Sequence, residues 1–193
     1  PTALDKLWGS SALSQAHFAL TYNILGLRPT AALGYSSGET NALMAFGAWA
    51  DMDRFIADAE ASGLFTHDLG GPFDAVQQAW NDTRPVDWEL WTLLAPVPLV
   101  LAAVADETRC HLAIVHSDAD VIIAGDAAAC ARVRARVRGS SARLSYDLAV
   151  HVPELGHVSD RWRALHHRPT LDIHGVRFYS NASHTAYAAT ADR

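Results

Sequence analysis

A glycine–serine–glycine pattern at residues 32–40, ALGYSSGET, constrains the fold of this chain more than any other feature. The apolar residues before it suit a short buried strand, and from Ser37 onward the apolar residues recur at helical spacing. A strand, a tight turn and a helix in this order form the setting of a nucleophile elbow. We expect Gly34 and Gly38 to remove side chains where the turn crowds the backbone, so that Ser36 stands above the sheet as a nucleophile.

The turn also predicts where negative charge would be stabilised. The backbone N–H of Ser37 and the positive end of the following helix can stabilise an oxyanion, and Tyr35 completes the elbow. The alternative is an ordinary serine in a glycine-rich loop.

Composition limits the classes of protein that this chain can belong to. Its 193 residues are 50% hydrophobic and 19% charged, with a net charge of -6, which is typical of a globular protein and argues against a broad nucleic-acid surface. Four arginines between residues 132 and 138 are interpreted as a solvated helix face. Cys110 and Cys130 have neither disulfide-framework nor zinc-ligand spacing, which favours a reducing compartment, and we expect a cytoplasmic protein.

The most apolar segment, LLAPVPLVLAAVA at residues 93–105, is too short to span a bilayer and contains two prolines. We therefore expect a buried strand or core segment there, and no membrane association.

The periodicity predicts an α/β chain. Helices are expected at 11–25, at 51–61 with Gly63 as a stop, at 126–139 and at 153–167, and strands at 30–35, 111–116, 120–125, 143–151 and 176–181. The two strands and the helix in the middle of the chain suggest a small split β-α-β lobe. The expected boundaries lie near Ala105 and His151, which gives segments 1–105, 106–150 and 151–193.

A serine nucleophile needs a base, and the chain has ten histidines. The expected base is His151, because it stands at the end of a predicted strand and precedes a helix, where α/β folds place functional side chains. His157 lies inside a helical pattern and is a less favoured base. The remaining histidines that we weighed fit structural positions on helices or strands: His17, His111, His116, His166 and His167. No zinc-type spacing accompanies the segment HSDAD at 116–120, so we expect no metal.

Four segments, in order, resemble the acyltransferase domains of polyketide synthases, fatty-acid synthases and polyunsaturated fatty-acid synthases. GLRPTAALGYSSGETNALMAFGAW resembles the GHSxGE segment, DVIIAGDAAAC the VVISG strand, LAVHVPEL the AFHSPLM segment and RFYSNAS the FYSNVTG strand. Together the segments cover nearly the whole chain. Tyr35, where histidine is usual, is more similar to the polyunsaturated fatty-acid synthases and related iterative enzymes.

This resemblance implies an α/β-hydrolase-like lobe with an inserted ferredoxin-like lobe. It also implies acyl transfer from acyl-CoA to the phosphopantetheine of an acyl carrier protein, with Ser36 acylated and His151 as the base. Such chemistry needs no metal or redox cofactor. The implied partners are the carrier protein and other domains of the same megasynthase.

The chain departs from the family pattern at several points. The GQGxQ loop and the segments after FYSN have no counterpart, so we expect part of a domain. The arginine of malonyl-selective members, about twenty-five residues after the serine, falls in register on Ala61, beside Glu60, and Leu148 replaces a common polar residue before the histidine. Both departures predict an apolar acyl pocket, because a buried carboxylate without a cation is costly.

Two other classes remain open. A serine hydrolase or thioesterase could draw its acid from Asp118, Asp120 or Asp126. A catalytically silent docking lobe of a megasynthase would use neither Ser36 nor His151.

Overall fold

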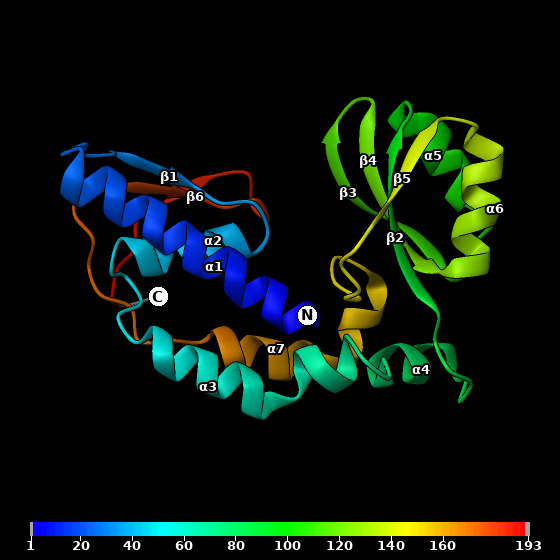
Figure 1. Ribbon diagram of the computed structural model, residues 1–193, viewed down its shortest axis with the longest axis horizontal. Coiled ribbons are helices and arrows are strands. Elements are labelled where there is room, and N and C mark those ends of the chain that lie inside the picture. Colours follow the sequence, from blue (N-terminus) through cyan, green and yellow to red (C-terminus); the bar gives the residue numbers. More distant parts are fainter. Residues whose placement is uncertain (1, 192–193) are drawn as a thin grey trace. The chain divides into compact units, whose positions relative to one another are not determined.

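The computed structural model describes residues 2–191 as a mixed α/β protein with two separate sheets (Figure 1). The chain divides into two compact units. The second unit is Ser62–Arg163, and the first combines the residues before and after it. Each unit is described by itself.

The first unit contains a sheet of three strands in the order β1-β6-β7. β1 (Ala31–Leu33) runs parallel to β6 (Arg177–Tyr179), and β7 (Ala186–Tyr187) is antiparallel to β6. The helices α1 (Ala3–Ala19), α2 (Ser37–Ala45) and α3 (Met52–Ser62) belong to this part of the chain. Its buried centre is Ala48, Phe178 and Ala189, around which aromatic and aliphatic side chains pack.

The first helix begins earlier than its sequence pattern predicted. Thr2 and Asp5 form a capping box, in which the Asp5 N–H donates to Thr2 Oγ1 (3.1 Å) and the Thr2 N–H to Asp5 Oδ2 (2.7 Å). The helix therefore starts at Ala3 rather than residue 11, and a π-helix, Leu20–Ile24, continues it. Gly26, with φ of 68°, follows as the expected stop.

The second unit contains a four-stranded antiparallel sheet in the order β3-β4-β2-β5. Its strands are β2 (Trp88–Leu94), β3 (Cys110–Ser117), β4 (Asp120–Asp126) and β5 (Ser140–Leu144). The helices α5 (Val97–Val104) and α6 (Ala127–Val137) lie against one face of the sheet (Figure 1). The chain order is thus strand, helix, strand, strand, helix, strand. The core between these layers includes Leu93, Val100, Ile123 and Val133.

This unit begins well before residue 106. β2 pairs with both β4 and β5, so residues 88–94 complete the small sheet, and α5 packs with it. The compact units consequently differ from the segments that we expected at 1–105, 106–150 and 151–193.

The strand alternative for residues 93–105 and most of the strand predicted over 143–151 are wrong, whereas the alternative of a core segment at 93–105 agrees with the structure. Most of residues 93–105 forms the helix α5, whose first turn accommodates Pro98 because the N–H groups there need no intrahelical acceptor. The strand expected over 143–151 ends at Leu144 with β5, and residues 145–152 have no regular structure.

The remaining helices of the second unit are α4 (Asp74–Trp80), a 3₁₀ helix over Pro153–Val158 and α7 (Ser159–His166), which runs past the unit's end. A π-helix, Leu64–Asp68, follows Gly63, which has φ of 70° and ends α3 as expected. No helix among residues 2–191 is long and apolar enough to cross a membrane.

Candidate active site

Ser36 occupies a strained turn between β1 and α2. It is the residue that caps α2, and its backbone angles, φ 52° and ψ −121°, lie outside the regions that L-residues favour. Such a conformation costs about 1–3 kcal/mol and persists only where surrounding contacts enforce it. The residue is exposed at the turn. The strand, turn and helix predicted around residue 36 are therefore present.

Gly34 makes this turn possible because it has no side chain. A Cβ atom at residue 34 would lie 1.9 Å from the Gly38 carbonyl carbon and 2.1 Å from the Glu39 nitrogen. Only glycine allows the strand to approach the start of the helix so closely. The expectation for Gly38 is wrong, because a Cβ there would meet nothing within 4 Å.

Two residues that the sequence analysis missed hold the elbow from the neighbouring strands. The Asn181 side-chain amide, after β6, donates a hydrogen bond to the Gly34 carbonyl. The Tyr187 hydroxyl, on β7, donates to Glu39 Oε1 (3.0 Å), and burial together with the Glu39 carboxylate raises the pKa of Tyr187. Only Asn181 carried a sequence signal: it is a polar residue shortly after β6, and β6 pairs with β1, the strand that leads to Ser36.

The start of α2 presents backbone donors beside Ser36. The N–H groups of Gly38 and Glu39 turn back to the carbonyls of Tyr35 (2.8 Å) and Ser36 (3.1 Å). Ser37 is the first residue of the helix, where an N–H has no intrahelical acceptor. Within the described part of the chain no hydrogen bond from the Ser37 N–H is found. This N–H is suited to receive an oxyanion.

His151 belongs to the second unit and lies in the irregular segment after β5, not at a strand end. Its backbone is left-handed, with φ of 60°. The residue is exposed overall, but desolvation by the surrounding protein lowers the pKa of its imidazole. A lowered pKa keeps the ring neutral near pH 7, as a general base requires.

The two residues expected to shape an acyl pocket differ in environment. Leu148 is fully buried, and its Cδ2 would lie 2.9 Å from a Cβ at Gly70. Ala61 is exposed in the last turn of α3. The nearest arginine along the chain, Arg54, donates to Asp58 (3.0 Å), and in space Arg161 donates to the Ser62 carbonyl and pairs with Asp68 (2.9 Å).

The acids considered for a hydrolase triad lie in three different settings. Asp126 caps α6 by accepting hydrogen bonds from the N–H groups of Ala128 and Ala129, both at 3.1 Å. Asp120 lies 3.5 Å from His116. Asp118 is exposed in the turn between β3 and β4.

Arg132, Arg136 and Arg138 are exposed, as expected for a solvated helix face, and the arginines on α6 also contact neighbouring side chains. Arg132 and Arg136 both contact Glu107, and the Arg134 guanidinium lies 3.3 Å from the centre of the Trp91 ring. Over residues 2–191, no group of three or more His, Cys, Asp or Glu side chains could hold a metal ion.

Known proteins share part of this sequence and its fold. No family model matches the chain. It is 24% identical over 179 residues to one of the polyunsaturated fatty acid synthase subunits of Thraustochytrium sp. (strain ATCC 26185 / S-3), an alignment that covers 88% of this chain and 9% of that protein. Among solved structures, the acyltransferase domain from the second module of the salinomycin polyketide synthase matches with a TM-score of 0.71 at 21% identity, over 98% of this chain and 42% of that one.

The chain has the acyltransferase-domain fold. The malonyl-CoA:ACP transacylase of Synechocystis sp. PCC 6803 also has this fold and matches with a TM-score of 0.68 at 20% identity, over 93% of this chain and 56% of that one. The chain therefore spans about half or less of these acyltransferase structures and a small part of the curated synthase. The resemblance to acyltransferase domains of polyketide and polyunsaturated fatty-acid synthases is confirmed.

Proposed function

We propose that this chain is the acyltransferase part of a polyketide or polyunsaturated fatty-acid synthase. In this role it moves an acyl group from a CoA thioester to the phosphopantetheine of an acyl carrier protein, through an acyl-serine. The observation that carries the proposal is the strained backbone of Ser36 at a strand-to-helix turn that only a glycine at residue 34 allows. The similarity in fold to acyltransferase domains supports the same reaction class.

The reaction has two half-steps. His151 takes the proton of Ser36 Oγ while the oxygen attacks the thioester carbonyl, and the CoA thiolate leaves with that proton as the acyl-serine forms. The thiol of the carrier protein then gives its proton to His151, attacks the acyl-serine and regenerates the Ser36 hydroxyl. The Ser37 N–H supplies part of the oxyanion hole in both half-steps. Neither half-step requires a metal or a redox cofactor.

The two units fit the lobes of this assignment. We assign the first unit to an α/β-hydrolase-like lobe, because it holds the parallel pair β1 and β6 and the elbow. We assign residues 88–144 to a ferredoxin-like lobe, because strands β2 to β5 and helices α5 and α6 follow the strand–helix–strand–strand–helix–strand order. The other domains of a cytoplasmic megasynthase are the proposed further partners.

The proposed donor is an uncharged acyl-CoA. Ala61 offers no cation to a donor carboxylate, and Arg54 on the same helix is paired with Asp58. Leu148 is apolar and buried among the residues that precede His151. An unpaired carboxylate would be poorly stabilised beside such side chains.

Intact-protein mass spectrometry tests the proposal. The full-length protein is incubated briefly and separately with malonyl-CoA, acetyl-CoA and a medium-chain acyl-CoA. We expect an adduct from the uncharged donors that Ser36→Ala abolishes, because the nucleophilic oxygen is lost. Ser37→Ala serves as the matched control and should retain the adduct, because it keeps the backbone N–H.

Each other outcome has a defined meaning. An adduct that persists in Ser36→Ala refutes the assignment. A dominant malonyl adduct refutes the uncharged donor but not the transferase. An acyl-enzyme that reacts with water and not with a pantetheine thiol indicates a hydrolase. Absence of any adduct, together with no reaction of Ser36 with a fluorophosphonate, indicates a silent docking lobe.

A further inference from the structure

The backbone at His151 is held from both sides. On the N-terminal side, Leu148 and Ala149 are fully buried, and the Ala149 N–H donates to the Leu69 carbonyl (2.7 Å). On the C-terminal side, Val152 is buried and the 3₁₀ helix begins at Pro153. A non-glycine residue with positive φ is unfavourable by itself, so these neighbours must maintain the conformation.

Glu154 is the anchor of the C-terminal side. This carboxylate is only 4% exposed, in the first turn of the 3₁₀ helix and three residues after His151. Its Oε1 accepts a hydrogen bond from Trp80 Nε1 (2.8 Å) and lies 2.9 Å from His111 Nε2. One side chain thus ties the 3₁₀ helix both to the end of α4 and to β3.

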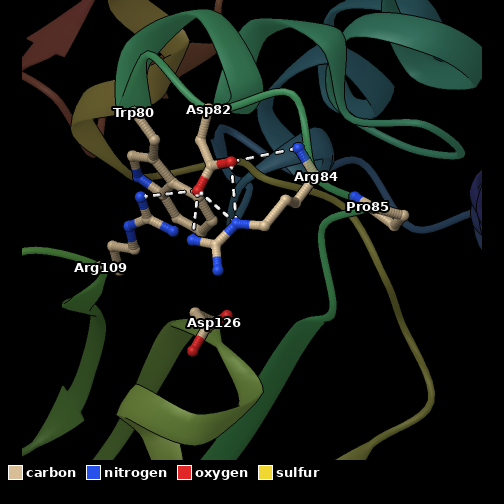
Figure 2. Close-up of a pocket in the computed structure, with 6 residues that line it drawn as sticks. All are labelled: Trp80, Asp82, Arg84, Pro85, Arg109 and Asp126. Atoms are coloured by element: carbon tan, nitrogen blue, oxygen red, sulfur yellow. Dashed lines mark hydrogen bonds and ion pairs between the residues drawn. The ribbon is translucent and has the colours of Figure 1, made fainter.

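Neighbouring charged side chains hold the Trp80 ring in place (Figure 2). The Arg109 guanidinium lies 4.7 Å from the centre of the Trp80 ring and pairs with Asp82 (2.9 Å), which also binds Arg84 (2.6 Å). These residues line a pocket of about 160 Å³ next to the start of α6. Trp80 also stacks on Trp88 of β2, with ring centres 6.0 Å apart.

His111 provides the second rigid partner. It lies near the start of β3, an edge strand of the sheet, and is paired in register with Ala124 of β4. Trp80 and His111 therefore hold Glu154 in a fixed position relative to α4 and to the small sheet.

The Glu154 side chain is a carboxylate in a buried position, where apolar side chains are usual. Desolvation acts to raise the pKa of Glu154, but hydrogen bonds from His111, its own backbone and Trp80 outweigh this effect and lower the pKa overall. Glu154 Oε2 is buried and has no hydrogen-bond partner among the described residues. A buried carboxylate gains little stability over well-packed apolar groups, whereas its hydrogen bonds specify one orientation.

We propose that Glu154 is a positioning residue for His151: held by Trp80 and His111, it fixes the left-handed backbone that aims the imidazole. The proposal rests on the function proposed above, because it assigns His151 as the base. Glu154 itself touches neither substrate nor the reacting atoms. Its effect is on the geometry of proton transfer, for which a misplacement of about 1 Å lowers the rate by about 100-fold.

The test compares two buried carboxylates of the same unit. Glu154→Ala removes the anchor. Glu107→Ala is the matched control, because the Glu107 side chain is 5% exposed and also has two partners, Arg132 and Arg136, but it lies in the small lobe. The kcat and KM of steady-state acyl transfer, the pH profile and the thermal midpoint are measured for the full-length protein, alongside Ser36→Ala and His151→Ala.

We expect Glu154→Ala to lower kcat by about 10- to 100-fold, with KM for the acyl-CoA changed by less than about threefold. The acidic limb of its pH profile should move upward, because a released imidazole returns toward its ordinary pKa of about 6.5. Glu154→Gln should recover most of the rate, since its amide oxygen still accepts from Trp80. Glu107→Ala should lower the thermal midpoint while leaving kcat and the pH profile unchanged.

A double variant, Glu154→Ala with His111→Ala, tests whether the two side chains act as one unit. The combined loss in kcat should then not exceed the larger single loss. Wild-type kcat and pH profile in Glu154→Ala, or the same losses in Glu107→Ala, would overturn the inference. If transfer persists in Ser36→Ala and His151→Ala, the proposed function fails instead.

Discussion

At the scale of the residue, Gly34 decides whether the elbow can form. We predict that Gly34→Ala destabilises the protein by roughly 3 kcal/mol and abolishes labelling of Ser36, because the new Cβ would overlap backbone atoms that cannot move aside. Thermal unfolding and fluorophosphonate labelling measure the two effects. Gly38→Ala is the control: its Cβ meets no atom within 4 Å, and alanine suits the first turn of α2. Equal thermal midpoints for the two variants would contradict the steric argument.

Local turn chemistry explains which parts of the candidate site the sequence revealed. Gly34 and Ser36 lie within a few residues of the atoms that constrain them, so the motif carries the information. Asn181 and Tyr187 act on residues 147 and 148 positions away, and no local pattern predicts such pairs. Glu154 was missed for the same reason, since Trp80 precedes it by 74 residues.

At the scale of the element, a capping signal placed the start of some helices, although the capping box of α1 was missed. α6 is an example, because Asp126 begins it as expected, whereas Arg138 rather than Gly139 takes the left-handed conformation at its end. The helix α5 was missed because a short apolar run fits a buried strand and a buried helix equally. The segment after Leu144 was missed because Leu148 and Ala149 are buried without a strand partner: Ala149 binds the Leu69 carbonyl instead.

The cap of α6 gives a prediction at this scale. Asp126→Ala should lower the free energy of unfolding by about 1 kcal/mol, because the N–H groups of Ala128 and Ala129 lose their shared acceptor. Urea denaturation measures the change. Asp118→Ala, in the exposed turn between β3 and β4, should change it by less than about 0.5 kcal/mol. A loss for Asp118→Ala as large as that for Asp126→Ala would show that charge, and not capping, is responsible.

At the scale of the whole molecule, the acyltransferase fold is assembled from two compact units with separate sheets. The resemblance of four sequence segments identified the fold, but the expected boundary near Ala105 lies after the start of the second unit at Ser62 and the one near His151 lies before its end at Arg163. Strand β2 was hidden in a segment interpreted as part of the first lobe, because its pairing partners, β4 and β5, lie later in the chain.

The buried thiols of the second unit make it possible to watch that unit alone. Both cysteines of the chain, Cys110 on β3 and Cys130 on α6, are inaccessible, with their sulfurs 3.6 Å apart. Their hydrogen bond, together with burial, raises the pKa of Cys130, so the reactive thiolate is suppressed in the folded state. A maleimide or aromatic disulfide reagent should therefore react only when the second unit opens. The rate of thiol labelling then measures how often that unit opens. Rapid labelling of the native protein would contradict this, whereas unfolding of the first unit should leave the reagent unconsumed.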